Sequence, residues 1–232
     1  MYSKTHDELE DIIKKIVNIY KPYSIFLYWS KATLSDNINS DYELWIIFED
    51  GKYISRHTIA NLINNKGYSI FPFKLSEILN YNIDTPFPKT IYMNVLIHWG
   101  AKTLYGKKVI ENIEPRIINK EDLLADVYFN LWVWLSAIRV YKSGNITLAN
   151  DMFYKSCFYA TRDLIYYLDK KLCISYKEIY EASQKIEVLK NYKEIVNNAY
   201  HLRNNPNGEI DSQFFYNNIT YINKFILQII ER

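Results

Sequence analysis

Two short apolar segments separated by a polar connection place the tightest limit on how this chain can fold. Residues Ile25–Tyr28 and Leu44–Phe48 have the length and the β-branched and aromatic content of buried strands. The connection between them ends in Asp41 and Glu43, directly before the second segment. Because alternate residues of an extended chain share a face, we expect these carboxylates to point the same way and to hold one hard cation between them.

The rest of the first half predicts a mixture of helices and strands. An amphipathic helix is expected first, and a proline-containing connection with Glu114-Pro115 ends this half. The other expected elements are a short helix at His57–Asn64, a strand at Tyr68–Phe73, a helical turn at Ser76–Tyr81 and a weakly alternating strand at Thr90–His98.

The second half predicts long helices broken by glycine and asparagine. Ser143-Gly144-Asn145 separates the first two helices, and the segment from Asn204 to Gly208 separates the last two. The helices are expected at 121–142, 146–168, 175–186, 192–202 and 211–230. We therefore expect a helical bundle in this half.

The stretch from Trp29 to Glu43 resembles the signature of the nucleotidyltransferase superfamily, and most closely that of the kanamycin nucleotidyltransferase family. Trp29-Ser30 lies where the signature has Gly-Ser, and Ser40-Asp41-Tyr42-Glu43 lies where it has Ser-Asp-x-Glu. The resemblance extends in order over nearly the whole chain. It implies an α+β fold, with a nucleotidyltransferase-like mixed sheet and helices in residues 1–115 and a helical bundle in residues 116–232.

In this family the paired carboxylates bind Mg²⁺ (or Mn²⁺), which bridges the phosphates of a nucleoside triphosphate. The resemblance implies that Asp41 and Glu43 are metal ligands and that Ser30 and Ser40 contact the nucleotide or stabilise the turn. The implied reaction transfers a nucleoside monophosphate from the metal-bound triphosphate to a hydroxyl group of a small molecule. The resemblance makes an aminoglycoside-like molecule a candidate acceptor. Cations and fixed dipoles stabilise the charge that develops on the phosphate oxygens.

The chain departs from the family pattern at the phosphate-binding turn. Trp29 replaces a glycine that normally lets the backbone approach the phosphate closely. Thr33 replaces an arginine of the family, so Lys31 is the available positive contact to phosphate and would act as a point charge.

A third carboxylate of the family also has no counterpart. One pairing places Ile70 at its position, and pairing with the strand expected at Thr90–Ile97 makes Asn94 the nearest polar residue. An alkyl side chain cannot ligate a metal, and an amide is a weaker ligand than a carboxylate. Neither alternative restores the acid.

The general base of the family is a glutamate on the first helix of the helical half. The resemblance places Asn130 at that position, and asparagine cannot usefully accept a proton. Asp126 lies one turn earlier on the same helix face, so it is the available substitute. The family's dimeric sites imply a homodimer, with Trp132 and Trp134 as hypothetical contacts; Trp134 replaces a lysine of the family.

Composition bounds the partners and the compartment. The formal net charge of +2 and the sequence pI near 8.3 are too mild to call for nucleic acid or a membrane surface. Cys157 and Cys173 have the spacing of neither a zinc site nor a disulfide framework, so we expect a reduced, cytoplasmic setting. No apolar run approaches the roughly 20 residues that span a bilayer.

Two classes of function follow. The first is a nucleotidyltransferase that uses Asp41 and Glu43 for metal and Asp126 as base. The second is a catalytically degenerate protein that keeps the fold for nucleotide binding, regulation or interaction, as the residues Trp29, Ile70 and Asn130 indicate. A third interpretation is that Ser40-Asp41 only caps a turn and Glu43 lies on an exposed edge strand.

Overall fold

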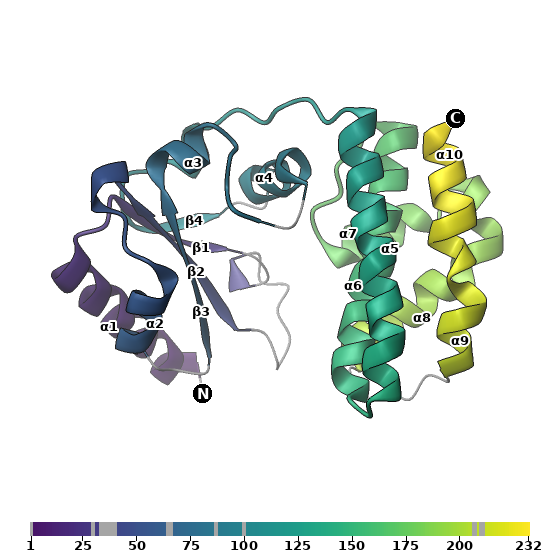
Figure 1. Cartoon of the computed structure of the whole chain (residues 1–232), viewed down its shortest axis with the longest axis horizontal. Coiled ribbons are helices and arrows are strands. Elements are labelled where there is room, and N and C mark those ends of the chain that lie inside the picture. Colours follow the sequence, from purple (N-terminus) through teal and green to yellow (C-terminus); the bar gives the residue numbers. More distant parts are fainter. Residues whose placement is uncertain are drawn as a thin grey trace. The chain divides into compact units, whose positions relative to one another are not determined.

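The computed structural model describes residues 2–28, 31–32, 41–63, 67–85, 88–98, 101–205, 208 and 212–232. The chain forms two compact units, Met1–Arg116 and Ile117–Arg232. The first contains a mixed sheet with helices and the second is helical, so the expected α+β class is confirmed (Figure 1).

The first unit is built on a four-stranded sheet of order β3-β2-β1-β4. Strand β1 (Ser24–Tyr28) pairs antiparallel with β2 (Tyr42–Phe48) and with β4 (Lys102–Gly106), whereas β3 (Tyr68–Lys74) runs parallel to β2. The buried residues of β1 and β2 explain why these two strands read as continuous apolar segments in the sequence.

Helices α1 (Tyr2–Tyr20) and α2 (Arg56–Ile63) cover one face of this sheet (Figure 1). The apolar residues of α1 recur at helical spacing and therefore form one stripe along the helix. Their burial shows that this stripe faces the strands. The core on this face contains Leu9, Ile12, Ile16, Ile25, Leu27, Leu44, Ile46, Phe48, Ile59 and Ile70.

Helix α4 (Lys89–His98) packs on the opposite face, after the short helix α3 (Leu75–Leu79). The strand predicted at Thr90–His98 was therefore wrong. Five residues of α4 are buried around its circumference, so its sequence lacks the polar stripe of an amphipathic helix. Periodicity does not distinguish such a segment from a buried strand.

Strand β4 was missed in the sequence because Lys102–Gly106 contains no apolar run and is largely exposed. It is a strand because it pairs with β1 at the edge of the sheet. Gly106 adopts a φ of +81°, and a Cβ added there would lie 2.2 Å from the carbonyl oxygen of Tyr23. Glycine therefore permits both the left-handed backbone and the close approach of the two segments.

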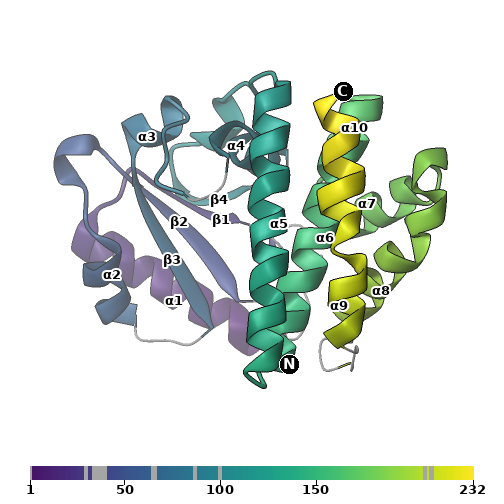
Figure 2. The same cartoon turned by 45° about the vertical axis from the view of Figure 1, so that its right-hand side comes forward.

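The second unit is a bundle dominated by α5 (Lys120–Lys142) and α6 (Ile146–Asp169), which lie side by side (Figure 2). Helices α7 (Tyr176–Ser183) and α8 (Lys193–Asn204) follow. The chain ends in α9 (Ser212–Asn218), a π-helical segment (Tyr221–Ile226) and α10 (Leu227–Glu231). Short 3-10 helices occur at Asp50–Lys52, Ile110–Asn112 and Glu187–Tyr192.

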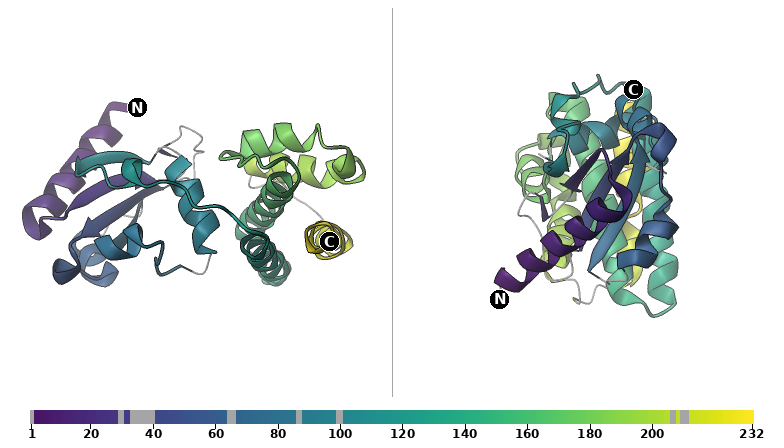
Figure 3. Two further views of the ribbon diagram at one scale, coloured as in Figure 1. Left: turned by 90° about the horizontal axis from the view of Figure 1, so that it is seen from above. Right: turned by 90° about the vertical axis from the view of Figure 1, so that its left-hand side faces the viewer.

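Polar caps explain where the long helices begin. The Asn119 side chain accepts a hydrogen bond from the backbone N–H of Asp122, whose carboxylate accepts one in return from the N–H of Asn119. Asn145 caps α6 and Ser175 caps α7. In each case the side-chain oxygen of the cap accepts a hydrogen bond from a backbone N–H of the first turn, that of Leu148 or of Glu178. In the left view of Figure 3 the bundle is seen from above, with α5 and the C-terminal helix nearly end-on.

Trp134 lies in the core of the second unit and not on its surface. The side chain is fully buried, its indole N–H donates to the carbonyl of Phe215, and Phe153 packs edge-on against its ring. The hypothesis that Trp134 is a dimer contact was therefore wrong. Trp132, two residues earlier, is 61% exposed, because residues two apart on a helix face different directions.

Helix α5 is the one described helix that is long and apolar enough to cross a membrane by length and composition alone. Its inward side carries Asp126 and Asn130 beside the buried residues that pack on the other helices. A core helix of a bundle has the same composition, so this feature is weak support for a membrane span.

Candidate functional site

The predicted metal ligands Asp41 and Glu43 lie where β2 begins. Asp41 directly precedes the strand, and Glu43 is its second residue. Glu43 is level with Tyr28 of β1 on one side and with Ser69 of β3 on the other. Paired residues of neighbouring strands share a face, so Tyr28, Glu43 and Ser69 form a row across three strands.

This row lies on the α4 face of the sheet. Leu44 is buried against the α1 side, so Glu43 and Trp45 point to the other side. The Tyr28 and Trp45 rings are 5.2 Å apart, and each is 5.9 Å from the Tyr92 ring of α4. These aromatic rings form an apolar floor beside the half-buried carboxylates.

Asp41 is held by a neighbouring strand. The Ser69 hydroxyl donates a hydrogen bond to Oδ2 of Asp41. Both side chains are half-buried. The two carboxylates supply oxygen ligands, which Mg²⁺ prefers, and Mg²⁺ commonly takes one or two carboxylates together with water and substrate phosphates. The donor set therefore fits a magnesium ion.

Glu43 influences the neighbouring phenol of Tyr92. Burial raises the pKa of Tyr92 most, a hydrogen bond with Tyr28 lowers it, and the negative charge of Glu43 raises it further. The net direction is upward from an ordinary value of 10.0, so the Tyr92 phenol stays protonated at physiological pH. It remains a neutral hydrogen-bonding group beside the acidic row.

Lys31 is the predicted nucleotide contact that the structure describes. Its ammonium lies 5.2 Å from the centre of the Tyr42 ring, next to Asp41 in sequence. Tyr42 in turn stacks on Tyr68 at 5.1 Å. The other predicted contacts, Ser30 and Ser40, lie outside the described residues, as does Trp29. Their roles stay predictions.

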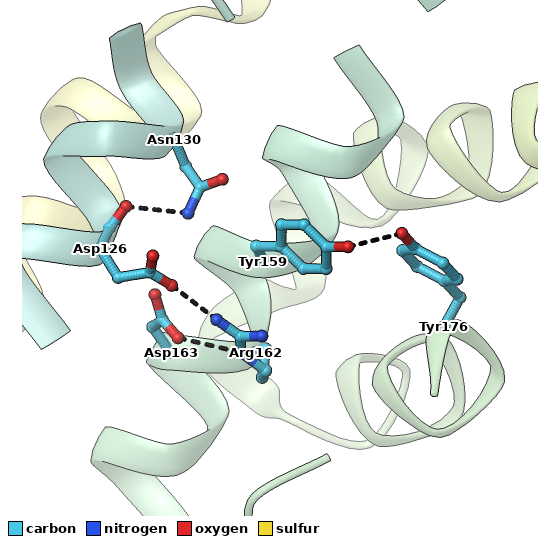
Figure 4. A network of polar contacts seen from close by, with 6 residues as sticks. All are labelled: Asp126, Asn130, Tyr159, Arg162, Asp163 and Tyr176. Carbon is cyan, nitrogen blue, oxygen red and sulfur yellow. Dashed lines mark hydrogen bonds and ion pairs between the residues drawn. The ribbon is translucent and has the colours of Figure 1, made fainter. Parts of the chain in front are cut away.

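Asp126, the predicted base, belongs to a buried ionic cluster in the second unit (Figure 4). Its Oδ2 accepts a 2.5 Å bond from Nη2 of Arg162, and Nε of the same guanidinium donates to Asp163 at 3.1 Å. The Asn130 amide donates to the backbone carbonyl of Asp126 at 2.8 Å. Asp126, Arg162 and Asp163 are each at most 5% exposed.

Two carboxylates share one guanidinium in this cluster. Burial raises the pKa of Asp163 well above its ordinary value, the charge of Asp126 and a hydrogen bond with Asp126 raise it further, and Arg162 lowers it. A proton on Asp163 removes the repulsion between the acids and provides a donor to Asp126. The hydrogen-bond donors to the Asp126 carboxylate therefore come from residues of the helical unit itself.

Comparison with known proteins supports the fold. No family model matches the chain, and no curated protein matches it. Among the 11 matching solved chains is the crystal structure of spectinomycin adenyltransferase AAD(9) from Enterococcus faecialis with ATP and spectinomycin. It is 11% identical with a TM-score of 0.61, over 98% of this chain and 99% of that chain. The chain has a nucleotidyltransferase-like fold.

The register of β3 on β2 shows where Ile70, the residue paired with the third-carboxylate position, lies. Ile70 is level with Leu44, and both point into the α1 core, away from Glu43. Asn94, the alternative, lies on α4 and is bound to the Tyr81 hydroxyl and to the backbone of Arg116. Neither residue faces the acidic row. Within the described ranges no three His, Cys, Asp or Glu residues gather as metal ligands.

The residue of β3 that does lie beside Glu43 in this nucleotidyltransferase-like fold is Ser69, which sequence reasoning missed. The signal for it was present, because Ser69 is the polar residue that breaks the apolar run of the expected strand. Choosing between Ser69 and Ile70 required the register of β3 on β2, since a shift of one residue exchanges the two faces.

Proposed function

We propose that the protein is a nucleotidyltransferase that moves a nucleoside monophosphate from a metal-bound nucleoside triphosphate to a hydroxyl group of a small molecule. The observation that carries this proposal is the pair Asp41 and Glu43 at the start of β2, with Ser69 bonded to Asp41. A site of this kind on a nucleotidyltransferase-like fold supports nucleotide and small-molecule partners. The solved neighbour binds ATP and spectinomycin, which supports an aminoglycoside-like acceptor.

Asp41 and Glu43 would hold Mg²⁺ or Mn²⁺. When bound, the ion neutralises charge on the phosphate oxygens and helps to align the triphosphate. Lys31 would add a positive point charge near Asp41, and Ser30 and Ser40 would contact the phosphates. The rings of Tyr28, Trp45 and Tyr92 pack against one another beside the carboxylates and would limit the access of water from that side.

Asp126 remains the proposed base, and its surroundings define what that role requires. Its Oδ2 is occupied by Arg162, so the carboxylate would have to bind the acceptor hydroxyl through its other oxygen or exchange partners. Arg162 therefore competes with the acceptor hydroxyl for this carboxylate.

A catalytically degenerate protein that binds nucleotide is the second candidate function. The observation that favours it is the ionic cluster itself, because Arg162 and Asp163 give Asp126 a structural role within the bundle. The departures at Trp29 and Asn130 favour the same candidate. In either case we propose a homodimer and a reduced, cytoplasmic setting, the latter supported by the free thiols of Cys157 and Cys173.

Calorimetric titration of the full chain with each nucleoside triphosphate, with and without Mg²⁺ or Mn²⁺, tests the proposal. We expect metal-dependent binding that is lost in Asp41→Asn and in Glu43→Gln, because each removes an anionic ligand. Asp11→Asn is the matched control, since Asp11 is an exposed carboxylate of the same unit, 3.9 Å from Lys14. Binding that is unaffected by both substitutions would contradict the proposal.

Transfer then separates the two candidates. Incubation of the triphosphate that binds with hydroxyl-bearing aminoglycosides and aminocyclitols, followed by mass spectrometry, detects the added nucleoside monophosphate. Product formed by the parent and absent in Asp41→Asn supports the enzyme. Metal-dependent binding without product from any acceptor supports the degenerate protein.

A further inference from the structure

The contact between β3 and Asp41 assigns a role to a residue outside the predicted site. Ser69 is half-buried, is level with Glu43 in the parallel pairing of β2 and β3, and donates a hydrogen bond from its hydroxyl to Asp41. Phe73 lies four residues further along β3, and the centres of the Phe73 and Trp45 rings are 4.2 Å apart. Because strand side chains alternate, Ser69 lies on the same face as Phe73, Trp45 and Glu43.

Asp41 needs an external partner to keep one orientation. It precedes the first paired residue of β2, Tyr42, so the strand ladder does not include it. Within the part of the chain that the structure describes, Ser69 provides the one side-chain hydrogen bond to the Asp41 carboxylate. A carboxylate on a strand end otherwise samples several rotamers, and ordering it for a ligand costs free energy.

We infer that Ser69 is a positioning residue for the cation site. Its hydroxyl holds Oδ2 of Asp41 and thereby orients this carboxylate for the divalent cation that Asp41 and Glu43 would share. This inference rests on the proposed function, because it concerns the same pair of carboxylates. Partners that orient metal ligands typically contribute about 10-fold to 100-fold in metal affinity.

Mn²⁺ alone is the probe, so the test does not depend on nucleotide or on turnover. The Mn²⁺ dissociation constant of the full chain is measured by electron paramagnetic resonance for the parent, Ser69→Ala and Ser69→Thr. We expect Ser69→Ala to bind Mn²⁺ about 10-fold to 100-fold more weakly. Ser69→Thr keeps the hydroxyl on a residue that suits a strand, and we expect it to restore the parent affinity.

Ser24→Ala is the matched control. Ser24 is a buried serine of the same sheet, at the far end of β1, and its hydroxyl donates to the carbonyl of Lys107 at 2.7 Å. Removing that hydroxyl is expected to lower thermal stability while the Mn²⁺ affinity stays that of the parent. A loss of affinity in Ser24→Ala equal to that in Ser69→Ala would overturn the inference, because general destabilisation would then account for both.

The failure of this inference is distinguishable from the failure of the proposed function. If the parent binds Mn²⁺ and Asp41→Asn does not, but Ser69→Ala binds like the parent, the cation site stands and the role of Ser69 is overturned. If the parent binds no Mn²⁺, the proposed cation site fails and the inference fails with it. Weak binding in both Ser69→Ala and Ser69→Thr would likewise overturn the role of the hydroxyl.

Discussion

Asp163 is a buried acid whose neighbours favour its protonated form. Burial, then the charge of Asp126, raises its pKa above that of an unfolded aspartate, which is about 3.9. Between these two pKa values the native state holds a proton that the unfolded state has lost. The stability that protonated Asp163 contributes to the native state is therefore fully present at low pH. It is lost as the pH rises toward the pKa of Asp163 in the folded protein.

Replacing Asp163 with Asn removes this pH dependence. An amide is neutral at every pH and still donates a hydrogen bond to Asp126, so we expect Asp163→Asn to lose less stability than the parent between pH 5 and pH 8. Urea unfolding at both pH values measures the difference. Asp169→Asn is the control, because Asp169 is an exposed carboxylate on the same helix. Equal pH dependence in the parent and Asp163→Asn would contradict the prediction.

The residues of the candidate site differ in how far the sequence could indicate them. Asp41 and Glu43 could be proposed from the sequence because their i, i+2 spacing precedes an apolar strand, a pattern that local sequence contains. Ser69 and Arg162 were missed because each contacts its carboxylate across 28 and 36 residues of chain, respectively. No local pattern carries that information.

At the scale of elements, β4 depends on the glycine at its end. Gly106 and Gly144 have similar positive φ values, +81° and +87°, but only at Gly106 would a Cβ meet a backbone atom. We expect both Gly→Ala substitutions to cost about 1–3 kcal/mol of backbone strain. Gly106→Ala should cost about 1–3 kcal/mol more, because the Cβ displaces Tyr23 and strains the β1–β4 edge.

Thermal unfolding of the two variants checks this difference. Gly144→Ala serves as the matched control for strain without a clash, since nothing lies within 4 Å of its added Cβ. Equal losses of stability in the two variants would show that the contact of Gly106 with Tyr23 has no energetic consequence.

The elements that were predicted correctly have strong local signals. Helices α5 and α6 begin at asparagine caps, and Ser143 and Gly144 separate them. Helix α4 and strand β4 failed because their identity depends on what covers them. An apolar segment buried all round becomes α4, and a polar edge segment becomes β4 through its pairing with β1.

At the scale of the whole molecule, two units with separate cores predict separable unfolding. Trp134 is fully buried within the second unit, so Trp134→Ala should cost that unit about 3–5 kcal/mol. Mn²⁺ bound at Asp41 and Glu43 should stabilise the first unit. Calorimetry should therefore show one transition lowered by Trp134→Ala and another raised by Mn²⁺. A single transition that responds to both would contradict separable unfolding.

Trp132 tests the proposed homodimer. Its side chain is 61% exposed, so Trp132→Ala should change the stability of the second unit by less than about 0.5 kcal/mol. If Trp132 contacts a second copy, light scattering should show a dimeric parent and a more dissociated variant. A parent that is monomeric at working concentration would eliminate the dimer.

Local sequence signals were enough for the α+β class, most of the helices, three of the strands to within two residues at each end, and the acidic pair before β2. Helical and strand periodicity, caps and turns act within a few residues, so the sequence contains them directly. Three features depended on how the elements pack: Ser69 lies beside Glu43, Trp134 is buried while Trp132 is exposed, and Arg162 binds Asp126. Strand register and helix packing bring together residues far apart in the chain, and their free energy depends on burial that no local segment specifies.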